Sequence, residues 1–168
     1  MATSTPESPD TPRAVAALRA LGVSHVVVRH QPVNSLAEAA ELRGVRPADI
    51  VKTLVVRRAD DDYLFVLVPG DREISWPKLR AHLGVSRLSM PSAEVAREAT
   101  GYERGTITPF GSTRAWPVIA DASLPGRTIS IGAGAHGVSA TLAADDAIAA
   151  LSAHVADVTE PAERAPAD

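Results

Sequence analysis

The stretch IVKTLVVRRADDDYLFVLVP, residues 50–69, contains the most informative strand of the chain and predicts two strands joined by a turn. β-Branched, aliphatic and aromatic residues dominate both halves, and the aspartates at 60–62 separate them. We therefore expect a β-hairpin over 50–69.

Lys52 stands inside the first of these strands, among aliphatic residues. Side chains alternate between the two faces of a strand, so Lys52 shares a face with Ile50, Leu54 and Val56. A lysine is rarely buried without a function, because taking its ammonium out of water is unfavourable and lowers its pKa. Either the ammonium enters a binding pocket, or the side chain extends along the sheet to solvent. Lysine is rare in this arginine-rich chain, with Lys78 as the only other example, which favours the pocket.

The stretch TGYERGTITPFG, residues 100–111, predicts a shaped loop. Gly101, Gly105 and Gly111 permit positive φ and a close approach of backbone to a ligand, whereas Pro109 fixes φ. Exposed N–H groups of such a loop suit a carbonyl or phosphate oxygen. An ordinary turn-rich connection is the alternative interpretation.

The remaining pattern predicts one α+β domain over 11–158, with a mixed, mostly antiparallel, curved sheet flanked by helices. Ser35 with Glu38 forms a capping box, and Thr11 is expected to cap the first helix. Polar, proline-rich composition predicts disordered tails over 1–10 and 159–168. Helices are expected at 12–21, 36–43, 76–83, 91–99 and 143–155, and further strands at 25–30, 115–121, 127–132 and 137–143.

Composition excludes several classes of protein. A net charge of -3 argues against a protein that grips nucleic acid by bulk attraction, although a local basic patch is compatible with it. The absence of cysteine excludes disulfides, thiolate catalysis and cysteine-ligated zinc, and the histidines lack a metal-ligand spacing. The polar start and the lack of a long apolar run predict a soluble, cytoplasmic protein that binds no membrane.

GAGAHG, residues 132–137, matches the dinucleotide fingerprint only literally. A nucleotide site needs a helix at the third glycine, whereas VSATLA, residues 138–143, alternates like a strand. We interpret the segment as a hairpin turn whose glycines, Gly132 and Gly134, face a ligand.

Several of these features occur together in a known family. His30-Gln31-Pro32 precedes a helix containing EAAE, and Lys52 lies in its strand. Gly105 and Pro109 follow, then Asp121 at a strand end and the glycine-rich hairpin with His136. Over about residues 13–155 the chain resembles the YbaK/EbsC family of aminoacyl-tRNA deacylases, related to the editing insertion of bacterial prolyl-tRNA synthetases. The resemblance implies a compact, barrel-like α+β fold and hydrolysis of a mischarged aminoacyl ester in trans, without metal, cofactor or covalent intermediate.

The resemblance also implies the site. Lys52 would bind terminal phosphate or ribose oxygens or steady the oxyanion, and the loop N–H groups would surround that oxyanion. Asp121 would bind the α-amino group, with a structural turn aspartate as the alternative, and the two histidines are either pocket or surface residues. The catalytic candidates are Lys52, Gly105, Gly111 and Asp121, and the substrate-binding candidates are His30, Thr53, Gly101, Thr108, Pro109, Phe110, Gly132, Gly134 and His136.

The substrate stays open between two small amino acids. Lys52-Thr53 resembles members that act on cysteinyl-tRNA(Pro), whereas GTITPFG, residues 105–111, resembles those that clear alanyl-tRNA(Pro). A non-catalytic module that recognises an aminoacyl group is the alternative function. The expected partners are the 3′ end of an aminoacyl-tRNA and prolyl-tRNA synthetase, and DNA is not expected. Candidate phosphate contacts are Arg57, Arg58, Arg72, Lys78, Arg80 and Arg104.

Overall fold

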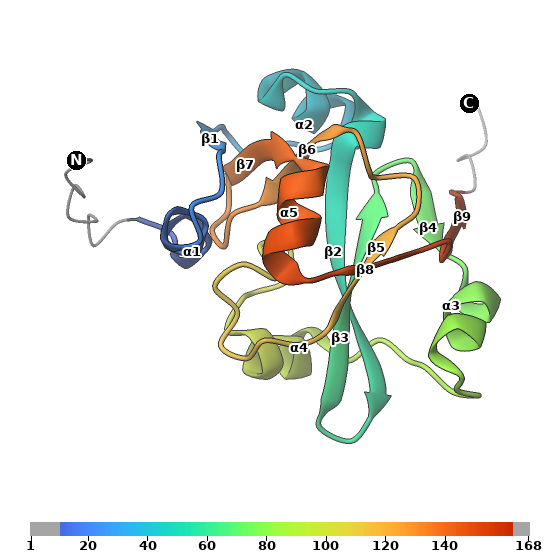
Figure 1. The fold of residues 1–168 in the computed structure, drawn as a ribbon. Coiled ribbons are helices and arrows are strands. Elements are labelled where there is room, and N and C mark those ends of the chain that lie inside the picture. Colours follow the sequence, from blue (N-terminus) through green and yellow to red (C-terminus); the bar gives the residue numbers. More distant parts are fainter. Residues whose placement is uncertain (1–10, 163–168) are drawn as a thin grey trace.

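The computed structural model describes residues 11–162, which form a curved sheet with helices packed on both faces (Figure 1). The main sheet has seven strands in the order β1-β7-β6-β2-β3-β5-β8, and β4 pairs with β9 in a two-stranded sheet. The strands are β1 (Val26–Arg29), β2 (Ile50–Ala59), β3 (Asp62–Pro69), β4 (Arg72–Ile74), β5 (Val118–Asp121), β6 (Thr128–Gly132), β7 (Val138–Ala143), β8 (His154–Ala156) and β9 (Thr159–Pro161). The helices are α1 (Arg13–Ala20), α2 (Leu36–Arg43), the 3₁₀ turn η1 (Pro47–Asp49), α3 (Trp76–Leu83), α4 (Ala93–Thr100) and α5 (Ala144–Leu151).

The predicted central hairpin is confirmed. Strands β2 and β3 pair antiparallel along their length, with Lys52 opposite Val68, and β3 is buried from Tyr63 to Pro69. A strand buried on both faces explains why β3 reads as a continuous apolar run rather than an alternating one.

The rest of the sheet mixes the two strand directions, which confirms the predicted α+β class. The antiparallel ladders β1–β7, β6–β7 and β2–β3 are long, whereas the parallel pairs β2–β6, β3–β5 and β5–β8 join only two or three residues each. The predicted hairpin of β6 and β7 is one of the long ladders. The short parallel pairs bring β6 beside β2, and β5 and β8 beyond β3.

Side chains that alternate along β2 and β3 pack into two separate hydrophobic cores. Val51, Val55 and Phe65 pack with α1, α4 and α5 on one face, whereas Val56 and Leu64 pack with α3 on the other. Burying these apolar faces supplies the main stabilisation of the fold, at roughly 25 cal/mol for each Å² removed from water. The two cores hold β2 rigidly along its whole length.

Local signals in the sequence are largely realised. Ser35 accepts a hydrogen bond from the Glu38 N–H at 3.1 Å, and Gly44 and Gly84 end α2 and α3 in the left-handed conformation. The predicted Thr11 cap is wrong, because the helix begins at Arg13 with Pro12 as its cap residue. Proline brings a fixed φ but no capping oxygen, so this helix start has no side-chain cap.

The C-terminal predictions need correction. Residues 154–155 are not helical but begin β8, which adds to β5 as a parallel edge strand. The tail predicted from residue 159 is wrong for Thr159–Pro161, because these residues pair with β4. Residues 115–117 precede β5 rather than belonging to it. The other predicted tail residues, 1–10 and 163–168, lie outside the described residues. Within residues 11–162, no helix is long and apolar enough to cross a membrane.

Candidate functional site

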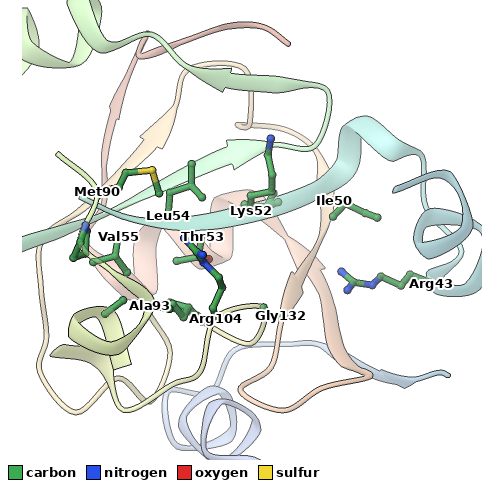
Figure 2. Close-up of a pocket in the computed structure, with 15 residues that line it drawn as sticks. Arg43, Ile50, Lys52, Thr53, Leu54, Val55, Met90, Ala93, Arg104 and Gly132 are labelled. Carbon is green, nitrogen blue, oxygen red and sulfur yellow. The ribbon is translucent and has the colours of Figure 1, made fainter. Parts of the chain in front are cut away.

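The candidate site is a cavity of about 300 Å³ beside β2, at a place where the sheet is interrupted (Figure 2). Along this edge, β2 pairs with β6 only at Ile50 and Val51, and the next partner is Ser89, which bridges Arg57. Residues 52–56 between these points have no strand partner on this edge within residues 11–162. The cavity occupies that gap.

The open edge presents backbone polar groups. Arg57 and Ser89 exchange both of their backbone hydrogen bonds, at 2.7 and 3.1 Å, so the peptide groups of Arg57 point towards this edge. Peptide direction alternates along a strand, and the N–H and C=O groups of Thr53 and Val55 therefore point the same way, into the gap. The Thr53 hydroxyl is also buried, and it has no hydrogen-bond partner in the described part of the chain.

The opposite wall comes from the predicted loop and from the end of β6. Arg104, Gly105 and Ile107 line the cavity together with Gly132. Gly105 has a φ of +91°, a conformation that favours glycine, and a side chain there would lie 3.6 Å from Cε1 of His136. Gly105 is thus a loop residue that lines the cavity in a conformation suited to glycine, with His136 beside it.

Three cations, Arg43, Lys52 and Arg104, line the cavity. Lys52 extends from one side of β2, whereas Thr53 lies on the other side with Arg104 (Figure 2). The Lys52 Nζ donates to the carbonyl oxygen of Arg72 at 2.6 Å, and burial lowers the pKa of Lys52, opposed by the nearby carboxylates of Asp71 and Glu73. Lys52 is therefore half-buried at the cavity, whereas its ammonium is bound on the β4 side, and a role for Lys52 in binding substrate stays a prediction.

The last turn of α2 supplies the remaining cation. Arg43 donates from Nε to His30 Nε2 at 3.2 Å and from Nη1 to the Ser130 hydroxyl at 3.3 Å. Burial lowers the pKa of Arg43, but a guanidinium stays charged in proteins. These contacts hold a permanent positive charge at the end of the cavity nearest Ile50.

Much of the predicted loop packs against the core instead. Thr108, Pro109 and Phe110 are buried, and Gly111 lies against α1, where Arg13 donates to its carbonyl oxygen. The Tyr102 hydroxyl donates to the Phe110 carbonyl oxygen at 2.6 Å and closes the loop. Gly101 lies beside Arg13 and Thr113, and Gly134 beside the Tyr102 ring. None of these predicted site residues lines the cavity.

Asp121 also lies away from the cavity. Its carboxylate is only 2% exposed and accepts from the backbone N–H groups of Ser123 and Val158, at 3.1 and 3.3 Å, and from the Ser123 hydroxyl. Burial alone would raise the pKa of Asp121, but these hydrogen bonds and one with Thr159 lower it overall. Arg72 donates to the Thr159 hydroxyl at 2.6 Å, so hydrogen bonds connect Asp121 through Thr159 and Arg72 to Lys52.

The two predicted histidines lie at the border of the site. The Nδ1 atom of His30 is 2.8 Å from the Gln31 carbonyl oxygen, while its other ring nitrogen receives the hydrogen bond from Arg43. His136 is exposed, lies close to Gly105, and has its Nε2 3.3 Å from a Glu103 carboxylate oxygen. Among residues 11–162, no group of three or more histidine, cysteine, aspartate or glutamate side chains is arranged to hold a metal ion.

The model of the aminoacyl-tRNA editing domain family matches residues 30–150, which contain the open edge of β2, the loop and the glycine-rich turn. The chain belongs to the aminoacyl-tRNA editing domain family. This agrees with the resemblance found in the sequence.

Relatives of this editing domain include much longer proteins. The chain is 35% identical over 127 residues to a proline–tRNA ligase of Heliobacterium modesticaldum, and the match covers 75% of this chain but 21% of the ligase. A proline–tRNA ligase of Levilactobacillus brevis is 36% identical over 89 residues, covering 53% of this chain and 16% of the ligase. The editing domain thus spans about a fifth of the first ligase and less of the second.

Solved structures that resemble this editing domain have nearly its own size. A candidate trans-editing enzyme for prolyl-tRNA synthetase superposes with a TM-score of 0.81 at 26% identity, covering 92% of this chain and 99% of that one. A hypothetical protein superposes with a TM-score of 0.80 at 27% identity, covering 88% and 99% of the two chains. The fold exists, therefore, both as a free-standing chain and as part of a ligase.

Sequence reasoning missed several residues of the editing-domain cavity. Arg43 ends a helix that otherwise consists of alanine, leucine and glutamate, and nothing in its spacing indicates that it turns inwards. Met90, Pro91, Ala93, Ala96 and Ile107 complete the apolar lining. Of the six basic residues predicted to contact phosphate, Arg104 alone lines the cavity.

Proposed function

We propose that this editing domain is a trans-editing deacylase that hydrolyses the ester of a mischarged aminoacyl-tRNA. The observation that carries the proposal is the cavity at the open edge of β2, which combines an apolar lining with three cations. A small aminoacyl group suits the apolar part, and the ribose and terminal phosphate to which it is attached suit the cations. Membership of the editing family and the likeness to a candidate trans-editing enzyme support the same reaction.

The reaction is the addition of water to the ester carbonyl, followed by loss of the ribose hydroxyl as the C–O bond breaks. The negative charge that forms on the carbonyl oxygen needs fixed N–H donors, and one such donor is worth about 3–4 kcal/mol. The backbone near Gly105 and the open edge at Thr53 and Val55 are the sources we propose. Lys52 and Arg104 would hold the phosphate or ribose oxygens.

The proton transfers require a group from the substrate or a held water. Among the described residues that line the cavity there is no carboxylate, histidine, serine or cysteine, and Thr53 is the one hydroxyl. We propose that water is the nucleophile, and that the neighbouring ribose hydroxyl of the substrate orients this water and passes its proton to the leaving ribose oxygen. A covalent intermediate with the protein is not part of this route.

The size of the cavity favours a small amino acid. Val55, Met90, Ala93, Ala96 and Ile107 surround its apolar part, and a side chain the size of cysteine or alanine fits a cavity of about 300 Å³ that also holds part of the ribose. Both Cys-tRNA(Pro) and Ala-tRNA(Pro) remain candidate substrates. Prolyl-tRNA synthetase is the proposed partner, because the relatives are proline–tRNA ligases.

The deciding experiment is turnover of a panel of aminoacyl-tRNAs. Purified protein is incubated with Ala-, Cys-, Ser- and Pro-tRNA(Pro), with and without EDTA, and the remaining ester is measured over time. We expect multiple turnover on Ala- or Cys-tRNA(Pro), no effect of EDTA, and little hydrolysis of Pro-tRNA(Pro). Failure to release any amino acid above the uncatalysed rate would overturn the proposal.

One observation favours a second function, a module that recognises an aminoacyl group without hydrolysing it. The cavity offers no acid or base of its own, and the Lys52 ammonium is engaged by the Arg72 carbonyl oxygen. Such a module would bind a non-hydrolysable aminoacyl-adenosine amide and release nothing from any ester of the panel. Binding without turnover therefore distinguishes the two functions.

A further inference from the structure

A second hollow, of about 530 Å³, lies beyond the cavity along β2, and it is basic although the chain as a whole is acidic. It is lined by Arg57, Arg58, Arg80 and Arg87, with Asp60 as its one acidic residue. We call these four arginines the arginine groove. Its positive charge contrasts with the net charge of -3 for the whole chain.

Two of the four guanidiniums are paired and two are not. Arg57 contacts Asp60, and Arg58 donates to Asp62 at 3.0 Å, so their charges are partly balanced. Arg80, from α3, and Arg87, from the link after α3, make no hydrogen bond or ion pair with any residue of the described part of the chain. Within residues 11–162 the donors of these two guanidiniums are unused, and guanidinium forks match phosphate oxygens.

The arginine groove is continuous with the cavity. The link 85–92 runs beside β2 and is fastened to it by the bridge between Ser89 and Arg57. Ser89 and Arg57 line both the groove and an intermediate hollow, which in turn shares Met90 and Pro91 with the cavity. Met90 is 45% exposed at that junction and offers a polarisable thioether to a flat ring.

We infer that the arginine groove binds the phosphates of a tRNA strand whose aminoacylated end occupies the cavity. This inference rests on the proposed function and names the path of its substrate. Single-stranded nucleic acid is bound where a basic track follows the backbone and side chains with favourable ring contacts lie against the bases. The groove supplies such a track, and the Met90 thioether supplies a favourable contact for a ring. Asp60 and Asp61 at the hairpin tip repel phosphates, so the strand passes on the side of Arg80 and Arg87.

The test measures binding of uncharged tRNA(Pro), by fluorescence anisotropy, to wild-type protein and to Arg80→Glu/Arg87→Glu. We expect the double variant to bind at least tenfold more weakly and to lose about 1.4 from the slope of log K against log salt, at about 0.7 for each single-strand phosphate contact. The matched control for the single variant Arg87→Glu is Arg29→Glu. It makes the same change of charge on the edge strand β1, far from the groove. We expect the control to change affinity by less than twofold.

A second readout separates the groove from the chemistry. The double variant should hydrolyse a minimal aminoacyl-adenosine ester at the wild-type rate, while KM for full-length aminoacyl-tRNA rises about tenfold. Unchanged tRNA affinity, or equal losses in Arg87→Glu and Arg29→Glu, would overturn the groove. If the double variant no longer co-elutes with prolyl-tRNA synthetase but binds tRNA with unchanged affinity, the groove binds a protein partner and the inference is wrong. If tRNA binding depends on the groove but the protein hydrolyses no ester, the inference about the groove is supported and the proposed deacylase function is wrong.

Discussion

Gly105 and Gly111 stand in one short loop and both have positive φ, yet they face different parts of the molecule. Gly105 faces the cavity, whereas Gly111 packs against α1, where an added side chain would lie 2.6 Å from the Tyr102 hydroxyl and 2.8 Å from the Arg13 carbonyl oxygen. The other predicted site residues divide in the same way. Lys52, Thr53 and Gly132 join Gly105 at the cavity, and Asp121 joins Gly111 in buried structure. Residues of one family signature therefore divide into those that line the cavity and those that pack in the buried structure. Mutations can distinguish the two groups.

Gly111→Val should give the largest effect, a loss of about 3 kcal/mol or more in the free energy of unfolding. Both the φ of +73° and the two close contacts oppose a side chain at this position. Thermal denaturation should show a drop in Tm of about 10 °C for a domain of this size. A variant that melts like wild type but has lost turnover would instead place Gly111 at the substrate.

Gly105→Val should lower kcat/KM about a hundredfold, because Gly105 lines the cavity and an added side chain would narrow it. The matched control is Gly126→Val, whose φ of +83° is similar to the +91° of Gly105 but which has no atom within 4 Å of the added carbon. Both variants carry the strain of positive φ, about 1–3 kcal/mol, so their Tm values should fall together. Equal turnover in the two variants would show that the loop only connects α4 to β5.

Lys52→Ala should lower kcat by about tenfold and leave Tm nearly unchanged.

Lys52→Arg keeps the charge, and this variant tests the pH dependence of the activity. Burial lowers the pKa of Lys52, so the ammonium loses its proton below the usual value of about 10.4. Wild-type activity should therefore decline as pH rises through that lowered pKa, whereas the arginine variant, whose charge persists, should not show this decline. Identical alkaline limbs in the two pH profiles would contradict a role for the charge.

Asp121→Asn should have the smallest effect, a loss of about 1 kcal/mol at neutral pH, because an amide accepts fewer of the hydrogen bonds around it. The folded-state pKa of Asp121 is lowered, so its contribution is complete above the unfolded-state pKa of about 3.9 and is lost as pH falls through the folded-state value. Wild-type and variant Tm values should differ at pH 7 and converge in acid. A difference that persists at low pH would point to packing rather than charge.

Features of the fold and site that depend on residues close in the sequence could be predicted, whereas those that depend on distant residues could not. The hairpin at 50–69, the Ser35 cap and the β6–β7 turn follow from neighbouring residues, and all were predicted correctly. The division of the loop was not predictable, because it depends on Arg13, which reaches Gly111 from almost a hundred residues away. The cavity likewise depends on where the parallel pairing with β6 stops, and no local pattern encodes that point.

The short parallel pairs bear on how the protein folds. The β2–β3 hairpin closes over a few residues, whereas β6 must return across roughly 80 residues to meet Ile50 and Val51, and β8 adds to β5 still later in the chain. Closing a long loop is entropically unfavourable, so such pairings form late in folding. We expect the β2–β3 hairpin to form first. The cavity beside β2 would accordingly be completed only when β6 reaches Ile50 and Val51.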